Sequence, residues 1–471
     1  MAAATRLRAA GLHVSVVERA AHPGGCLSVA SEADFSAPVA GQVVASTSRV
    51  LLAWAREQAA AVGRVSLERA VLTQVHRCRL ERVRGRRLGM LARAPGIRLD
   101  QSLRLLRLER LLRSFAPLLE LSHPERGARL DDRSLADFGR LYFGAPSLRR
   151  VLVPALLSTA PCLPEETSRM LWLLHAANAQ GAPEDIAVLH GAEFAAALAS
   201  PLAVEYGVEI TAVERDDRAV YRVCGKWREH RAAVRSGSLS RAEWYADAVV
   251  LATPAPVAAA LAAPWLKEVE REFLRGAPYL PALAVVLRAA GSLGERFSLV
   301  RNSHQAVTAA AYLHDLAARP DKKFGLVRFP EGEDCILARL TWESAITAQA
   351  SVSPETVAVA IPTPAWASAH FDAPDATIIR CVLAQLELLQ SGFTARVRRA
   401  CVQRYRPGAP HFPVGRYREL QRFRRLECES RAEGRRLYFA GDYLAGPFLE
   451  AALHTGLRAA DDLLADAAAV V

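Results

Sequence analysis

Glycine and aspartate near the C-terminus form a pattern suited to binding an oxygen-rich ligand. An apolar strand predicted over residues 437–440 ends in Gly441-Asp442, and a loop with Gly446-Pro447 leads into a helix. Glycines let a ligand approach the backbone closely, and the Asp442 carboxylate can accept hydrogen bonds from hydroxyl groups. The free N–H groups at the start of the helix can face an anion or an electron-rich ring. The helix carries leucines at helical spacing: Leu449, Leu453 and Leu457.

A second candidate ligand-binding segment lies at the N-terminal end. Residues 2–10 are strong helix formers, Gly11 stands where a helix often ends, and residues 13–17 form a short β-branched strand. Glu18 stands at the end of that strand. In dinucleotide-binding folds, an acidic residue at the end of the second strand binds the hydroxyls of the adenosine ribose. We therefore expect Glu18 to bind a ribose.

Both segments resemble motifs of the superfamily of flavin amine oxidases, protoporphyrinogen oxidases and carotenoid (phytoene) desaturases. Glu18-Arg19 followed by Gly24-Gly25 is similar to the second motif of this superfamily, although Cys26 stands where arginine is usual. The segment 436–460 is similar to its C-terminal flavin-binding motif. The resemblance implies FAD as cofactor and an α/β fold, with a Rossmann-like FAD-binding domain and a discontinuous α+β substrate domain. The cofactor-binding residues that it implies are Glu18, Arg19, Gly24, Gly25, Ile210, Gly441, Asp442, Leu449 and Glu450.

The resemblance also implies which part of the cofactor each residue contacts. Asp442 would contact the phosphate or ribityl chain of the flavin. The backbone at Leu449 and Glu450 would face its pyrimidine edge, where an N–H group can stabilise charge on the reduced ring. The strand predicted over 208–213 would touch the adenine through the backbone of Ile210. No metal site is predicted, because the eight cysteines show no C-x-x-C pair and no metal-like spacing.

Positions on the substrate side favour an apolar molecule over an amine. Flavin amine oxidases carry a lysine on a strand of the substrate domain, and our alignment of residues 277–289 puts Ala284 at that place. They also frame the amine with two aromatic side chains. Only one is identifiable here, Phe448, which becomes a candidate for the wall of the substrate site. His411 and His454 are candidate proton carriers because histidine titrates near neutrality, and the catalytic residues are otherwise unassigned.

These features predict an FAD-dependent oxidoreductase that removes hydride from an apolar substrate, as protoporphyrinogen oxidases and carotenoid desaturases do. Reduced flavin would pass its electrons to oxygen or a quinone. Three alternatives stay open. They are a flavin amine oxidase, a cofactor-free remnant acting as an interaction protein, and a peripheral membrane-associated factor that handles a lipid.

Composition limits the partners. The chain has 471 residues, of which 51% are hydrophobic and 23% charged, as in globular proteins with more than one domain. Its net charge of +11 comes from arginines scattered over the whole chain, so nucleic-acid binding is not predicted. The cysteines are interpreted as reduced thiols, and the sequence has no recognisable signal peptide and no uncharged run of about 18 residues. These features predict a cytoplasmic protein. Leucines and arginines over 101–122 predict at most weak association with the inner face of a membrane.

Five stretches are predicted to make up the two domains. The FAD-binding domain takes residues 1–75, 186–254 and 401–471. Residues 76–185 form a mainly helical part of the substrate domain, and residues 255–400 form the rest of it. The strands expected within these stretches cover 208–213, 247–254, 282–287, 326–329 and 335–341. The expected helices cover 50–61, a segment that begins at 257, and 374–389.

The first phosphate-binding motif of this kind of fold is missing from the sequence. A dinucleotide-binding domain needs a strand and a G-x-G-x-x-G turn before its first helix, because that turn binds the pyrophosphate. No such motif precedes Ala2, where the predicted helix begins. Two explanations stay open, a start codon assigned too late and a genuine truncation, and the consistency of the other motifs favours the first.

Sequencing the DNA upstream of the codon for Met1 tests this expectation. We expect roughly 10–20 further in-frame codons that encode an apolar strand and a G-x-G-x-x-G turn. A stop codon directly upstream in frame, with no such motif, would contradict the late-start explanation.

Overall fold

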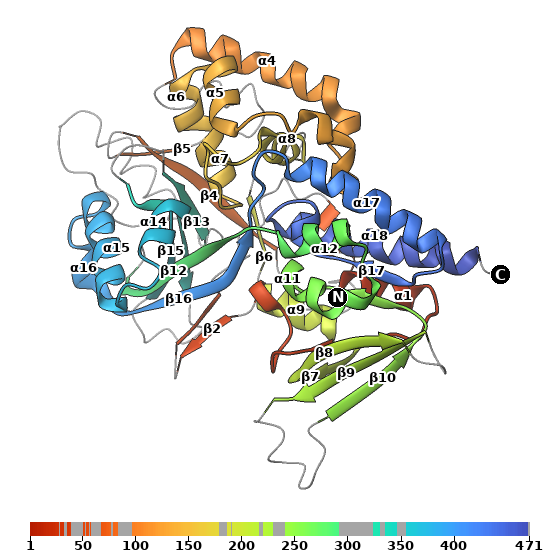
Figure 1. Cartoon of the computed structure of the whole chain (residues 1–471). Helices are drawn as coiled ribbons and strands as arrows, with labels where there is room; N and C mark the ends of the chain where they lie inside the picture. Colours follow the sequence, from red (N-terminus) through yellow and green to blue (C-terminus); the bar gives the residue numbers. More distant parts are fainter. Residues whose placement is uncertain are drawn as a thin grey trace.

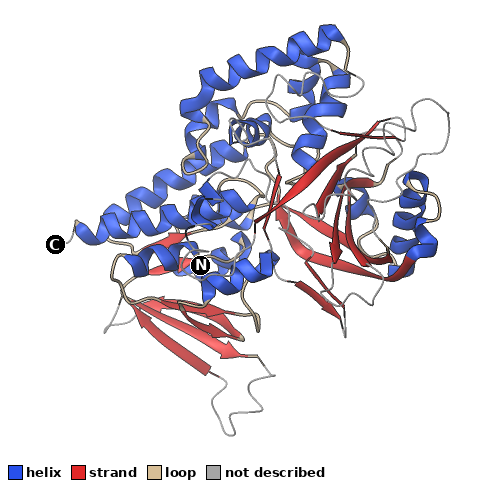
Figure 2. Cartoon of the chain, turned by 180° about the vertical axis from the view of Figure 1, so that it is seen from behind, coloured by secondary structure: helices blue, strands red, loops and turns tan. Residues whose placement is uncertain are grey.

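The computed structural model shows an α/β protein with an eight-stranded sheet, a three-stranded sheet, smaller two-stranded sheets and a helical part (Figure 1). Seen from behind, an eight-stranded sheet and a three-stranded sheet lie on opposite sides of the molecule, with helices above and between them (Figure 2). The structure describes residues 1–27, 29–32, 35–38, 50–51, 53–55, 57, 67–76, 79–82, 97–178, 186–189, 191–215, 220–228, 241–291, 324–329, 335–345 and 355–469.

The eight-stranded sheet collects strands from distant parts of the chain. Its central strand pairs are antiparallel, whereas β13 and β4 run parallel. Strand β6 (Ile186–Leu189) pairs with β4 outside the main order. The main order is β16 (Val397–Pro410), β12 (Tyr279–Ala290), β15 (Glu355–Pro362), β14 (Leu337–Ala345), β13 (Phe324–Arg328), β4 (Leu67–His76) and β5 (Arg79–Arg82).

Both faces of β12 are buried, which explains its nearly continuous apolar sequence. Successive side chains of a strand point to opposite faces of its sheet. One face packs against helices α14 (Pro364–Ala369) and α15 (Asp375–Leu389). The side chains of β12 on that face are Leu283, Val285 and Leu287. On the other face, Ala284 and Val286 pack with Val359 and Cys401.

Two parallel strand pairs form the core of the part predicted to bind a nucleotide. Strand β1 (Ser15–Glu18) pairs with β7 (Ala203–Tyr206), and β11 (Val249–Leu251) pairs with β17 (Leu437–Phe439). Parallel partners require long connections, so this part is assembled from stretches far apart in the sequence. An antiparallel sheet lies beside it, formed by β8 (Val208–Arg215), β9 (Tyr221–Trp227) and β10 (Arg241–Ala246).

Helix α1 (Ala2–Ala9) packs on the last helix, α18 (Leu449–Ala468). A glycine allows the close approach, because a Cβ atom on Gly456 would lie 3.3 Å from the Cβ atom of Ala2. The two ends of the chain therefore belong to one structural part.

The helical part begins with α4 (Leu99–Phe115), whose buried stripe consists of Leu105, Leu108 and Leu112. Ser134 caps the N-terminus of α5 (Leu135–Phe143), because its hydroxyl accepts a hydrogen bond from the Asp137 N–H at 3.0 Å. That helix ends at Gly144, whose φ of 85° favours glycine. Further on lie the short helix α7 (Val153–Leu157) and the buried helix α8 (Arg169–Asn178).

Most of the expected elements are confirmed, with ends shifted by a few residues. The expected strand over 13–17 is β1 at Ser15–Glu18, and the expected helix over 374–389 is α15. Of the helix expected over 50–61, the described residues 50–51, 53–55 and 57 are helical, and the rest of the expected range lies outside the described residues. The α/β fold class is confirmed. The five-part division stays a prediction, but strand pairing extends the eight-stranded sheet across its boundaries, because β4 begins at residue 67 and β16 runs through residue 400.

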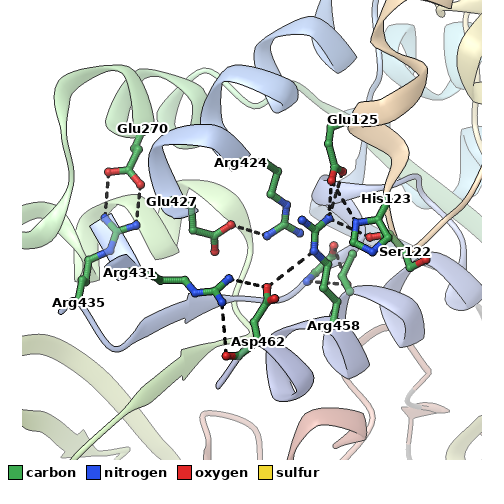
Figure 3. A network of polar contacts seen from close by, with 12 residues as sticks. Ser122, His123, Glu125, Glu270, Arg424, Glu427, Arg431, Arg435, Arg458 and Asp462 are labelled. Atoms are coloured by element: carbon green, nitrogen blue, oxygen red, sulfur yellow. Dashed lines mark hydrogen bonds and ion pairs between the residues drawn. The ribbon is translucent and has the colours of Figure 1, made fainter. Parts of the chain in front are cut away.

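A network of arginine–carboxylate pairs ties together the helices beside the nucleotide-binding part (Figure 3). Arg435 makes two hydrogen bonds to Glu270 of α12 (Glu268–Arg275), at 2.7 and 2.9 Å, and both side chains are buried. Arg424 and Glu427 are both buried on α17 (Arg416–Ala432), and the Arg424 Nη1 atom lies 2.6 Å from the Glu427 Oε2 atom. The remaining pairs link Arg458 to Glu125 and Arg431 to Asp462 and Asp466.

Removing one charge of a buried pair leaves its partner buried and uncompensated, which is strongly destabilising. We expect Glu270→Gln to lower the free energy of unfolding by about 3 kcal/mol. Thermal and urea unfolding would measure the loss. The control is Glu429→Gln, since the pair between Glu429 and Arg425 is exposed and should change stability by less than about 0.5 kcal/mol. Equal losses in the two variants would contradict this explanation.

Candidate functional site

The Gly-Asp turn after β17 is fixed by a side chain of the last helix. Gly441 has a φ of 157°, and a Cβ atom there would lie 2.4 Å from the Tyr443 ring. The Thr455 hydroxyl oxygen accepts a hydrogen bond from the Gly441 N–H and lies within hydrogen-bond distance of its carbonyl, both at 3.1 Å. Helix α18 thus positions Asp442, the first residue of the short helix η7 (Asp442–Leu444).

Burial raises the pKa of Asp442 to about 6, although N–H groups of its own backbone and of Tyr443 oppose the shift. No side chain in the described part of the chain donates a hydrogen bond to this carboxylate. Burial raises the pKa of Tyr279 to about 12, and the nearby Asp442 carboxylate adds to the shift. The Tyr279 hydroxyl oxygen accepts a hydrogen bond from the Ala255 N–H at 2.9 Å. Asp442 is therefore a carboxylate that is costly to ionise until a donor reaches it.

Other polar atoms in this region also have no partner within the described residues. They are the hydroxyl oxygens of Thr253 and Tyr443, which are fully buried. Buried polar atoms in folded proteins are nearly always hydrogen-bonded, so a bound molecule can supply the partner of these two hydroxyls. The donor and acceptor set fits a polyhydroxyl and phosphate ligand better than an apolar one.

The N-terminal half of the predicted site is also assembled. Glu18 ends β1, and one of its carboxylate oxygens accepts a hydrogen bond from the Ala20 N–H at 2.7 Å. Burial lowers the pKa of the Met1 amine, and the nearby Glu18 carboxylate opposes this shift in part. Gly24 and Gly25 have φ values of 117° and 53°, and a Cβ atom on Gly25 would meet nothing within 4 Å. Both glycines thus adopt conformations that favour glycine, and Gly25 borders open space.

Two predicted residues contact the sheet over β8–β10. Arg19 is exposed and lies 4.0 Å from the Glu209 carboxylate, so its side chain pairs with a surface residue. Ile210 is partly buried in β8, where its side chain lies near Gly225 of β9. Their predicted contacts to the cofactor stay predictions, as do those of Glu18, Gly24 and Gly25.

Glu450 has a role that the sequence did not reveal. Its carboxylate is buried and accepts hydrogen bonds from the N–H groups of Val50 and Leu51, each at 3.0 Å. The side chain therefore binds another helix, which leaves only the backbone of Leu449 and Glu450 for the predicted contact to a ligand. Phe448 precedes α18 without capping it through its side chain, so these N–H groups are available.

Phe448 lies next to a histidine that the sequence did not single out. The ring centroids of Phe448 and His175 are 6.3 Å apart, and the Nδ1 atom of His175 is 3.3 Å from the Thr159 hydroxyl. A single histidine within the apolar helix α8 gives no signal in the sequence, so only the fold shows this contact. His454 lies 3.6 Å from the Glu450 carboxylate.

His411 is buried, with 6% of its surface exposed, and its Nε2 atom lies 3.2 Å from the Thr167 hydroxyl. Burial lowers the pKa of His411, so the ring is neutral near pH 7. This environment gives His411 a structural explanation, and a role in proton transfer remains only a prediction. Ala284 is 3% exposed and packs among Val286, Val359 and Cys401.

The residues 1–464 match the family model of flavin-containing amine oxidoreductases. The chain belongs to this family. It is an FAD-dependent oxidoreductase, and the predicted superfamily and cofactor are confirmed. The unpaired polar atoms around Asp442 fit FAD, which would be held by the Gly-Asp turn and the start of α18 and would supply the group that accepts hydride.

Solved structures of family members share the fold. Cyclohexylamine oxidase from Brevibacterium oxydans IH-35A is 15% identical, with a TM-score of 0.65 over 99% of this chain and 96% of that one. Putrescine oxidase bound to putrescine is 16% identical, with a TM-score of 0.66 over 98% and 96% of the chains. A putative protoporphyrinogen oxidase from Exiguobacterium sp. 255-15 is 16% identical, with a TM-score of 0.63 over 98% and 95%. Comparison with proteins of curated function gives no match.

Two kinds of site are not found within the described ranges. No group of three or more histidine, cysteine, aspartate or glutamate side chains there could hold a metal ion. None of the helices described is both long and apolar enough to cross a membrane.

The raised pKa of Asp442 leads to a prediction about FAD affinity. The free folded protein keeps this carboxyl protonated up to about pH 6, so its stability falls as the pH rises from the ordinary pKa of the group to that value. A hydroxyl donated by FAD stabilises the ionised form. We therefore expect FAD affinity to increase as the pH rises from 5 to 7, by at most about tenfold per unit below pH 6.

Asp442→Asn should weaken FAD binding by on the order of 1.5–3 kcal/mol and should flatten this pH dependence. Titration of FAD fluorescence against the wild-type and variant proteins at several pH values would measure both effects. The matched control is Asp461→Asn, which changes an exposed carboxylate of the same helical region. An Asp442→Asn protein with an unchanged pH dependence would contradict the assignment.

Proposed function

We propose that this oxidoreductase removes hydride from a carbon atom of an apolar substrate, as protoporphyrinogen oxidases and carotenoid desaturases do. The observation that carries the proposal is the environment of Ala284. This position, where flavin amine oxidases carry a lysine in our alignment, holds a small side chain buried in an apolar cluster. The described residues include two lysines, Lys226 on β9 and Lys267 just before α12. Neither of them lies in the eight-stranded sheet.

The surroundings of Phe448 support the same conclusion. A Cβ atom on Gly446 would lie 2.5 Å from the Phe448 ring and 3.1 Å from the Leu171 side chain. The wall there is made by apolar groups of the loop before α18 and of helix α8. Such a wall can orient an apolar substrate and exclude water, and the removal of hydride from carbon requires no strong base from the protein.

A flavin amine oxidase is the second candidate. It is favoured by the fold shared with cyclohexylamine oxidase and putrescine oxidase, but that likeness does not extend to a lysine at Ala284. Membership in the family disfavours the cofactor-free interaction protein. For the electron acceptor we propose oxygen or a quinone.

Anaerobic mixing of the FAD-loaded protein with candidate substrates separates these functions. We expect flavin absorbance to bleach with porphyrinogens or polyenes and to stay unchanged with a panel of simple primary amines. Photoreduction of the same sample serves as a control that the flavin can be reduced. Rapid bleaching by amines alone would establish the amine oxidase, and a protein without flavin absorbance after incubation with FAD would contradict both functions.

We further propose a cytoplasmic location with weak attachment to the inner face of the membrane. Six cysteines form no disulfide, as in reducing compartments: Cys162, Cys224, Cys335, Cys381, Cys401 and Cys428. Helix α4 exposes Leu99, Leu103 and Leu106, with 78%, 58% and 46% of their surfaces accessible. These leucines share one face of the helix with Arg110 and Arg113, and that pattern is typical of interfacial helices. Most of the basic stretch over 77–98 lies outside the described residues.

Sedimentation with anionic vesicles tests the attachment. We expect binding at low salt that is lost at high salt, because charge carries much of a weak interfacial contact. Leu103→Asn combined with Leu106→Asn should abolish it. The control is Leu388→Asn, since Leu388 is a leucine of α15 that is 69% exposed. Absence of binding at low salt would remove the membrane proposal, and binding unaffected by salt would assign the contact to burial alone.

A further inference from the structure

Arg339 is a partly buried arginine whose charge has no carboxylate partner among the described residues. Its Nη1 atom donates a hydrogen bond to the Ser158 carbonyl at 2.8 Å, and its Nε atom is buried without a partner. No carboxylate in the described part of the chain lies within ion-pair distance of its guanidinium. Burial lowers the pKa of Arg339 to about 10, so the group remains charged at neutral pH.

Three buried arginines of this protein pair with carboxylates. Arg424 pairs with Glu427, Arg435 with Glu270 and Arg416 with Glu419. A buried charge that is left without a counter-charge costs several kcal/mol. Arg339 departs from the pattern, and it keeps part of its surface accessible, where an anion from outside the chain can reach it.

The strand register places Arg339 on the sheet face of Ala284. On β14, Leu340 and Trp342 face α15, so the alternation of side chains turns Arg339 to the other face. Its partner on β15 is Ile361, which packs with the cluster that contains Ala284. Ala284 and Arg339 are thus two strands apart, which corresponds to roughly 10 Å.

A second arginine lies directly opposite Arg339. Arg328 of β13 is its register partner, so both side chains project from the same face of the sheet. A guanidinium group binds a carboxylate through two parallel hydrogen bonds.

Contacts from helix α7 onward connect this position to the wall of the candidate substrate site. Ser158, which accepts the hydrogen bond from Arg339, precedes Thr159. The Thr159 hydroxyl bonds the His175 ring, and that ring lies beside Phe448. These contacts therefore link Arg339 to Phe448, the residue that the proposed function assigns to the wall of the substrate site.

We propose that Arg339 binds a carboxylate group of the substrate. The substrate class is then an apolar molecule that carries an acidic group roughly 10 Å from the region of Ala284. The inference that the anion belongs to the substrate rests on the proposed function, whereas the anion site itself does not.

The test uses benzoate and its neutral analogue benzamide as probes, with binding measured by calorimetry on the purified protein. We expect the wild-type protein to bind benzoate about tenfold more tightly than benzamide, because a charge-assisted bidentate contact is lost in the amide. Arg339→Met should abolish this preference, and Arg339→Lys should retain part of it. The control is Arg380→Met, since Arg380 is an exposed arginine of α15, on the other side of the sheet.

Equal affinities for benzoate and benzamide in the wild-type protein would overturn the proposal, as would a preference that survives in Arg339→Met. Thermal unfolding shows whether the variants fold. If Arg339→Met does not fold, Arg339→Lys and the wild-type ratio decide. FAD absorbance is recorded on the same samples. FAD binding without a benzoate preference overturns only the anion site, and a benzoate preference that depends on Arg339 in a protein unable to bind FAD overturns only the proposed function.

Discussion

The packing of α1 on α18 is the contact on which the candidate site depends. Gly456 lets the two helices approach closely, and Thr455 next to it holds the backbone of Gly441. The same helix therefore joins the first residues of the chain and positions the Gly-Asp turn. Glu18 and Asp442 lie at opposite ends of the sequence, and this contact brings their strands into one nucleotide-binding part. The arginine–carboxylate network on α17 and α18 supports the same assembly from the other side.

The site contains charges that the folded chain does not neutralise. Asp442 is a carboxylate with a pKa raised to about 6, and Arg339 is a partly buried arginine without a carboxylate partner in the described ranges. Such groups reduce the stability of the free protein, and a ligand that pairs with them stabilises the fold by mass action. Opposite charges at two places also favour different ligand groups. A group rich in hydrogen-bond donors suits Asp442, whereas an anion suits Arg339.

Apolar and aromatic side chains lie in the neighbourhood of both charges. Phe448 and Leu171 line the loop before α18, and Ala284 packs in an apolar cluster on the sheet. An apolar wall contributes affinity without specificity, since contacts between hydrocarbon groups are not directional. A single buried cation can then fix which end of a substrate enters first, because its hydrogen bonds are directional.

The sequence by itself determined the features that depend on short segments. The Gly441-Asp442 turn, the strand that ends at Glu18 and the periodicity of α15 and α18 follow from local patterns, and together with the motif resemblance they predicted the α/β fold, the family and FAD. The tertiary structure decided what depends on partners far apart. It placed the Glu450 carboxylate on the N–H groups of Val50 and Leu51, His175 beside Phe448, and Arg339 opposite Arg328. No local pattern contains this information, because strand register and helix packing are set by the burial of whole faces and not by the residues of one segment.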